Sequence, residues 1–277
     1  MRPRRFVLVA VLASGLAAAA AVAMGQNIIV GNRGRTPPRF AVPKDFDGRF
    51  VYCRGFYRSV VREPGGQGWS TDYPAADNNF SVRLMELTRV AVKLNADRQP
   101  DHVVVRLDDP LLYRCPILFM EDVGTLQFTQ EEVERLRAFF LKGGFLWVDD
   151  FWGTDAWARW QREIARVLPS GEYPIFDLPL SHPILHALYD VKALLQVSSI
   201  QFWYQSGGLV SERGYDSAET HYRGIQDDRG RLMVLMTHNT DVADTWEREG
   251  ENRKYFELFS PRGYAIGVNV VLYAMTH

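Results

Sequence analysis

Two adjacent carboxylates, Asp149 and Asp150, end the stretch Phe145-Leu-Trp-Val-Asp-Asp-Phe-Trp-Gly153. The apolar and β-favouring residues before them predict a buried parallel strand that delivers both carboxylates to a turn. Ligands of open α/β sheets bind at that carboxyl edge. The pair could therefore do acid–base chemistry or bind a ligand. The alternative is that either carboxylate caps the next helix or holds the loop through backbone hydrogen bonds.

Polar side chains also follow other predicted strands. Asp72 and Tyr73 come after the first strand, and His238 begins a polar run after a strand at 231–237. Parallel strands would gather these groups at one edge, with aromatic side chains between them. His182, in Ser181-His-Pro183, is a further candidate, and the alternative for it is a loop histidine bonded to backbone. The candidate ligand-binding residues are Asp72, Tyr73, Asp149, Trp152, His182, Asn239, Asp241, Asp244, Trp246 and Glu247.

Asp150 and His238 form the candidate catalytic pair. Histidine titrates near neutral pH, and a carboxylate–histidine cluster in a crevice can transfer protons. The alternative is a structural histidine satisfied within the fold. The cofactor is unknown; histidine and carboxylates suit a divalent metal, although no H-E-x-x-H, paired-cysteine or EF-hand pattern occurs. The absence of G-x-S-x-G, Walker A and G-x-G-x-x-G signatures argues against a serine elbow and a nucleotide cradle.

The elements that must position these residues alternate between strands and helices. Helical spacing begins at Phe80, where Asp77 or Asn78 could cap the helix, and the box Thr129-x-x-Glu132 starts another. This order predicts one α/β domain with a mostly parallel sheet and helices on both faces. Strands are predicted at 49–53, 102–107, 116–120, 145–148, 196–203 and 231–237, helices at 80–94, 129–142, 155–167 and 264–275, and a long loop at 208–228. A strand at 270–273 is the alternative to the last helix.

Residues 1–25 have the pattern of a secretory signal peptide, with three arginines before an apolar run at 6–24. Residues 26–45, rich in Gly, Pro and Arg, predict a flexible leader. We therefore expect an exported protein, periplasmic or secreted, or one anchored in the membrane through residues 6–24 if the signal stays uncleaved. Arg4-Arg5 leaves open whether export uses the twin-arginine route. Without residues 1–25 the chain has 29 basic and 33 acidic residues, which argues against a nucleic-acid partner.

Cys53 and Cys115 are the only cysteines. Export would allow them to pair. The predicted strands put Cys53 near the end of one strand and Cys115 just before the start of its neighbour, at opposite edges of the sheet. We therefore expect two free, buried thiols.

Several separate motifs, in this order and spacing, resemble the DUF4159 family, a domain of unknown function, over residues 46–277. They are Trp69-x-x-Asp-Tyr-Pro74, the Gly-Gly-Phe-Leu-x-x-Asp-Asp-Phe-Trp-Gly core ending at Gly153, Ser181-His-Pro183, Tyr222-Arg-Gly-Ile-x-Asp-Asp-x-Gly-Arg231, His238-Asn-x-Asp241 and Gly267-x-Asn269. The resemblance implies a flavodoxin-like three-layer sandwich similar to class I glutamine amidotransferase domains. In that superfamily a nucleophilic cysteine occupies the turn after a central strand. Here that turn carries Asp149-Asp150, so amidotransferase chemistry is not carried over.

Three functions compete. The first is an exported, envelope-associated binding or accessory module whose crevice takes a small ligand, or which meets an envelope protein partner. The second is a hydrolase-like enzyme using Asp149, Asp150 and His238, with metal or acid–base assistance. The third is a scaffold with an exposed aromatic patch around Phe151 and Trp152. An enzyme needs Asp150 and His238 within reach of each other, whereas a binding module needs only the pocket.

Overall fold

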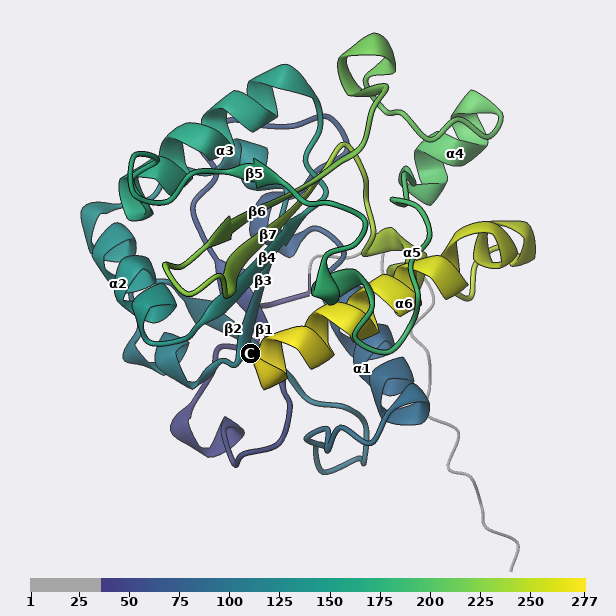
Figure 1. Cartoon of the computed structure of the whole chain (residues 1–277). Coiled ribbons are helices and arrows are strands. Elements are labelled where there is room, and N and C mark those ends of the chain that lie inside the picture. Colours follow the sequence, from purple (N-terminus) through teal and green to yellow (C-terminus); the bar gives the residue numbers. More distant parts are fainter. Residues whose placement is uncertain (1–35) are drawn as a thin grey trace, which may run out of the picture.

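A seven-stranded sheet in the order β2-β1-β3-β4-β7-β6-β5 forms the centre of the molecule (Figure 1). The computed structural model describes residues 36–277. The parallel strands are β1 (Tyr52–Phe56), β2 (His102–Arg106), β3 (Ile117–Glu121), β4 (Phe145–Asp149) and β7 (Leu232–His238). β6 (His221–Gln226) runs antiparallel to β7, and β5 (Phe176–Asp177) antiparallel to β6. The α/β class and the single domain are confirmed, and the sheet is mixed.

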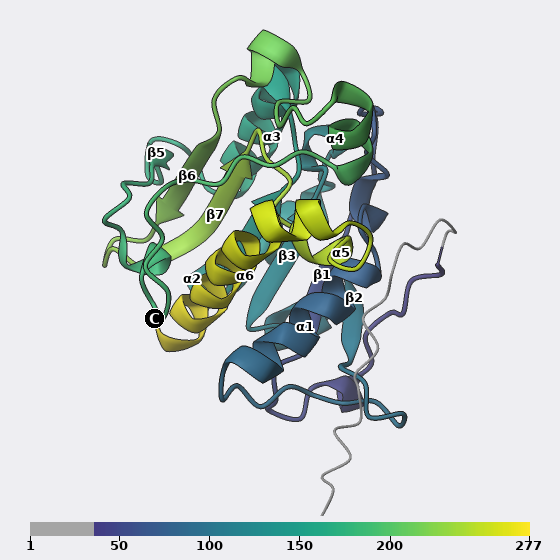
Figure 2. The same ribbon diagram turned by 90° about the vertical axis from the view of Figure 1, so that its right-hand side faces the viewer.

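Helices cover both faces of this sheet, and each face has its own hydrophobic core. The helices are α1 (Ala75–Leu87), α2 (Gln130–Leu141), α3 (Gly153–Val167), α4 (Ile200–Ser206), α5 (Asp244–Glu247) and α6 (Arg253–Thr276). Figure 2 shows α1 and α6 side by side on one face. Along β4, Phe145 and Trp147 belong to the core under these helices, and Leu146 and Val148 to the core under α2 and α3. Burial on both faces explains the unbroken apolar run that predicts this strand.

The ends of two helices test the capping predictions. The box at the start of α2 is confirmed, since the Thr129 hydroxyl accepts from Glu132 N and the Glu132 carboxylate accepts from Thr129 N. The cap at residue 77 or 78 is wrong, because α1 begins at Ala75. Asp77 is instead fully buried and accepts a hydrogen bond of 2.9 Å from Arg54 Nε. The Asp77 carboxylate, which the local sequence would assign to a helix cap, thus pairs with a guanidinium 23 residues away in the sequence.

The second half of the chain departs furthest from the predictions. The strand at 196–203 is wrong, because this segment contains α4, capped by Ser199 and ended by Gly207 at φ 75°. Its two buried side chains, Ile200 and Trp203, are three residues apart, as on a helix face. The predicted loop at 208–228 contains β6. The C-terminal helix is confirmed, and it starts earlier than expected, at Arg253.

The expectation of free thiols is wrong, because Cys53 and Cys115 form a disulfide with their Cα atoms 6.0 Å apart. The error came from strand boundaries. β1 begins at Tyr52, so Cys53 lies at its start, and Cys53 pairs in register with Leu118 of β3. Cys115, just before β3, therefore lies at the same edge.

The predicted signal peptide and the first part of the predicted leader lie outside the described residues. The last part of that leader runs beside the edge strand β2, where Ala41 N donates to Val104 O at 2.9 Å and Val104 N donates to Arg39 O at 2.8 Å. No helix within residues 36–277 is long and apolar enough to span a bilayer.

Candidate functional site

Three neighbouring strands end in the same unusual backbone conformation. Asp122 follows β3, Asp150 follows β4 and Asn239 follows β7, with φ angles of 53°, 50° and 60°. Asp72, at the same edge, has a φ of 61°. Few residues other than glycine adopt positive φ, although Asp and Asn do so most readily, and such residues gather at functional sites. The gathering of these turns makes the carboxyl edge of the sheet the candidate site.

Five carboxyl groups meet at this edge, and we call them the acidic cluster: Asp72, Asp150, Asp241, Asp244 and Glu247. Burial raises the pKa of Asp241 well above its ordinary value, and Asp150, Asp72 and Asp244 raise it further. Burial and then Asp244 raise the pKa of Glu247 to about 9. Burial and neighbouring acids therefore favour the protonated forms of Asp241 and Glu247, whereas Arg248 opposes the rise at Asp244, whose pKa burial raises only to about 6.

Within the cluster, Asp72, Asp244 and Glu247 could hold a metal ion. Each can offer one oxygen, and these three oxygens lie within 4.8 Å of one another. Asp72 Oδ2 is buried and has no hydrogen-bond partner among the described residues. The nearby cation is Arg248, whose Nε lies 3.6 Å from Asp244 and also pairs with Glu247. An all-oxygen set of this kind suits a hard cation such as Ca²⁺ or Mg²⁺.

Some cluster residues and their neighbours also hold loops. Asp244 Oδ2 accepts from Ile200 N at 2.7 Å and from the Tyr255 hydroxyl at 3.0 Å. Asp149 lies inside the sheet edge and accepts from Ala243 N at 2.9 Å and from the Thr237 hydroxyl. Burial raises the pKa of Asp149 to about 7. These bonds support the structural alternative for Asp149, which helps to fix the start of α5.

A cavity of about 10 Å³ lies beneath the edge, between the aromatic side chains of one core. Its polar lining comes from Glu121 and Asp149, and its apolar lining includes Trp147 and Trp246. This volume holds about one water molecule. The cavity is therefore too small for an organic ligand.

The candidate catalytic pair is not formed. His238 Nε2 lies 3.1 Å from Gly153 O, and its Nδ1 lies 3.3 Å from Arg223 Nη1. Burial lowers the pKa of His238 to about 4, so the ring is neutral at pH 7. Asp150 Oδ1 instead accepts from Trp152 Nε1 at 2.8 Å. No hydrogen bond or ion pair joins Asp150 to His238 in the described part of the chain, and His238 has the partners of a structural histidine.

Three other candidates have partners that explain them structurally. Asn239 accepts from Gly153 N and donates to Glu219 O, both at 2.8 Å. Trp152 is buried against this turn, and so is Phe151, so the aromatic patch that a scaffold would expose is not formed. Tyr73 is largely buried, and its hydroxyl accepts from Arg39 N at 3.1 Å.

Two candidates lie away from the cluster. His182 packs against Tyr273, whose hydroxyl accepts from Leu232 N at the start of β7. This is the amino edge of the sheet, opposite to the cluster, so His182 does not join the other candidates. Trp246 is buried in the core against Phe80, with the rings 5.0 Å apart.

Sequence reasoning missed three acidic groups at the same edge: Glu121, Asp122 and Glu63. Glu121 and Asp122 end β3 as Asp149 and Asp150 end β4, so the same pattern of a buried strand running into two carboxylates could have found them. Glu63, in the glycine-rich loop before Asp72, carries no comparable local signal, because only the fold brings it to Asp122.

The fold and this site define an α/β protein with buried carboxyl groups gathered at the carboxyl edge of its sheet. The chain belongs to the family described as "Domain of unknown function (DUF4159)", which matches residues 59–275. A search of curated proteins found no match.

Proposed function

We propose that this chain is an exported, envelope-associated binding module whose acidic cluster takes a divalent cation, with Asp72, Asp244 and Glu247 as ligands. The observation that carries the proposal is the grouping of three carboxylate oxygens within 4.8 Å of one another, with Asp72 Oδ2 buried and without a partner among the described residues. The main charged neighbours of Asp72 are all acids, whereas Arg248 offsets part of the negative charge at Asp244 and Glu247. A bound cation would replace the protons that Asp72 and Glu247 otherwise retain.

The chemistry of the cluster favours a hard cation with open coordination positions. Three carboxylate oxygens supply fewer ligands than the six to eight that Ca²⁺ takes or the six that Mg²⁺ takes. Water, or an oxygen of a small ligand or of an envelope protein partner, would complete the shell. The cation would then link this module to an anionic or hydroxyl-bearing partner at the strand ends.

Export is supported by the disulfide, because disulfides persist in oxidising compartments outside the cytosol. The signal-peptide pattern of residues 1–25 agrees with it. The parallel strands follow the order β2-β1-β3-β4-β7, which is the flavodoxin-like order and supports the inferred likeness to amidotransferase domains. The turn after β4 has no cysteine, so that likeness would be one of fold only.

The alternative is a hydrolase-like enzyme using Asp149, Asp150 and His238. It would need a hydrogen bond or a shared ligand between the acid and the imidazole. Asp150 and His238 have separate partners, and His238 is held neutral by its surroundings. The binding module is therefore the better-supported proposal.

The test is metal analysis and thermal unfolding of the oxidised protein, before and after chelation, with Ca²⁺, Mg²⁺, Mn²⁺ or Zn²⁺ added back. A specific cation at 100 times its Kd should stabilise the protein by about 2.7 kcal/mol. Asp72→Asn and Glu247→Gln should lose the response. The matched control Glu131→Gln, an exposed acid on α2, should keep it. A wild-type protein that responds to none of the ions, or an Asp72→Asn variant that responds like wild type, would contradict the proposal.

A further inference from the structure

Residues 57–71, which we call the glycine loop, lie across the carboxyl ends of β3 and β4. The long-range bonds that hold the loop include these three: Val60 N donates to Thr125 O at 2.8 Å, Gly68 N to Asp122 Oδ2 at 2.6 Å, and Trp152 N to Glu63 Oε1 at 2.9 Å. A Cβ atom at Gly66 would collide with the Asp122 carboxylate, so the loop backbone rests directly on that group. Two of the three bonds depend on carboxylates that face each other.

One carboxylate oxygen of Glu63 and one of Asp122 lack a hydrogen-bond donor among the described residues. These oxygens are Glu63 Oε2 and Asp122 Oδ1, and both are buried. The two carboxyl groups are close enough that each shifts the pKa of the other. Two ionised carboxylates cannot share this position without repulsion, whereas one shared proton makes an O–H···O bond. Burial, and then Glu63, raise the pKa of Asp122 to about 8.

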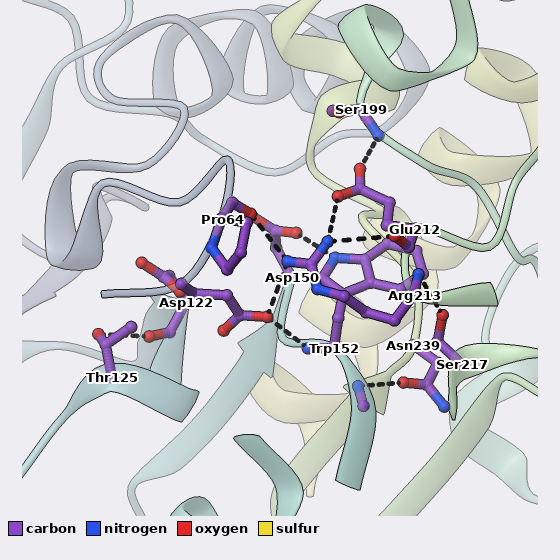
Figure 3. A network of polar contacts seen from close by, with 12 residues as sticks. Pro64, Asp122, Thr125, Asp150, Trp152, Ser199, Glu212, Arg213, Ser217 and Asn239 are labelled. Carbon is purple, nitrogen blue, oxygen red and sulfur yellow. Dashed lines mark hydrogen bonds and ion pairs between the residues drawn. The ribbon is translucent and has the colours of Figure 1, made fainter. Parts of the chain in front are cut away.

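The charged groups around Glu63 and Asp122 do not neutralise both carboxylates. Arg213 Nη2 lies 3.4 Å from Glu63 Oε1 and donates to Pro64 O at 2.8 Å, and its Nη1 lies 3.3 Å from Glu212 (Figure 3). This one guanidinium is thus shared between two acids. Asp150 adds a further carboxyl group from the turn after β4. The remaining titratable neighbour, Tyr57, donates its hydroxyl proton to the backbone carbonyls of Glu121 and Asp122.

We propose that Glu63 and Asp122 form a proton-operated latch, in which one shared proton holds the glycine loop closed over the ends of β3 and β4. On opening, the O–H···O bond breaks and the proton passes to water, which leaves two carboxylates that repel each other. Because the loop leads directly into Asp72, its release changes access to the acidic cluster. The latch itself does not depend on the proposed function. Only the identity of the species that would enter through the open loop, a divalent cation, rests on it.

The test is amide hydrogen exchange of the chelated, oxidised wild-type protein between pH 5.5 and 9, corrected for the intrinsic pH dependence. The opening constant of Val60 and Gly68 should rise by up to tenfold per pH unit while the shared proton is being lost. In Glu63→Gln, the amide can donate to Asp122 without any proton, so the loop should stay protected across the whole range. The exposed-acid variant Glu131→Gln should behave as wild type, and amides within β7 should stay protected in every variant.

Asp122→Asn gives the reciprocal measurement, because Asn tolerates the positive φ at this position and can donate to Glu63. It should also flatten the pH dependence. Loop protection that does not change with pH in the wild type, or a pH dependence that persists in both variants, would overturn the latch. Since no cation is present, these outcomes are independent of whether the acidic cluster binds one.

Discussion

Two groups of acids at the same edge of the sheet differ in the cation that the chain supplies to them. Asp77 and Glu121 surround the fully buried Arg54, which bonds to them at 2.9 Å and 2.5 Å. Burial alone would lower the pKa of Arg54, but its two acidic partners raise it well above its ordinary value. In the acidic cluster Arg248 pairs with Asp244 and Glu247, but within residues 36–277 no cation is among the main neighbours that shift the pKa of Asp72 or Asp241. The acids around Arg54 thus share a cation that the chain supplies, Asp244 and Glu247 share Arg248 at the surface of the cluster, and Asp72 and Asp241 have acids as their strongest charged neighbours.

Removing the guanidinium would break this comparison most directly. Arg54→Met should reduce the free energy of unfolding by about 3–5 kcal/mol, because it leaves Asp77 and Glu121 buried without their cation. Urea denaturation measures the loss. The control Arg49→Met removes an exposed ion pair with Asp47 and should cost less than about 1 kcal/mol. Equal stabilities for the two variants would mean that the buried pair is not what distinguishes the two groups.

The disulfide separates overall stability from cation binding. It closes a segment of 62 residues and fixes β1, the strand that carries Arg54. Replacing both cysteines with alanine should reduce the free energy of unfolding by about 2–4 kcal/mol. The thermal response to a divalent cation should remain, because none of the proposed ligands lies on β1: Asp72 follows it within the closed segment, and Asp244 and Glu247 lie on α5. Loss of that response in a folded double variant would show that the two groups of acids are not independent.

The pH dependence of stability sharpens the same contrast. A carboxyl group whose pKa is higher in the folded than in the unfolded protein stabilises the fold fully below its ordinary pKa, and this stability is lost as pH rises through the folded value. With Asp149 at about 7 and Asp122 at about 8, the free energy of unfolding should fall between pH 5 and 9 by about 3 kcal/mol through Asp149 and about 4 kcal/mol through Asp122. Urea denaturation across this range checks it. A flat or rising profile would contradict these raised pKa values.

The smallest effect is expected for Asp150→Asn. This residue accepts one side-chain hydrogen bond, from Trp152, and has a positive φ that Asn tolerates. An amide can accept the same bond and carries no charge, so stability should change by less than about 1 kcal/mol. Thermal unfolding and circular dichroism check it, with wild type as the reference. Marked unfolding would assign the Asp150 carboxylate a structural role like that of Asp77.

The sequence predicts those parts of the fold that depend on local patterns. The apolar run of β4 and the capping box of α2 are properties of a few adjacent residues, and both were predicted. Asp77 was assigned to a cap because nothing nearby reveals that Arg54, 23 residues earlier, will take its carboxylate. The cysteine pairing was missed because a shift of three residues in one strand moves Cys53 to the other edge of the sheet.

The candidate site shows the same limit. Placing acids after parallel strands predicted that Asp72, Asp150, Asp241, Asp244 and Glu247 would meet. The pattern could not separate them from Asp149, which has the same local setting as Asp150 but bonds to Thr237 and Ala243. His182 does not join the cluster: its Nδ1 accepts from Ile184 N at 3.2 Å, as the alternative of a loop histidine bonded to backbone predicts, and its ring packs against Tyr273.

The two margins of the sheet leave little free backbone for strand addition. At one margin β5 has only two residues, and at the other the segment 39–41 occupies the backbone N–H and C=O of Val104 in the middle of β2. Short or covered edge strands resist pairing with other chains. In the described part of the chain, intermolecular association through main-chain hydrogen bonding is therefore disfavoured, and recognition of any protein partner falls to side chains on helices and loops.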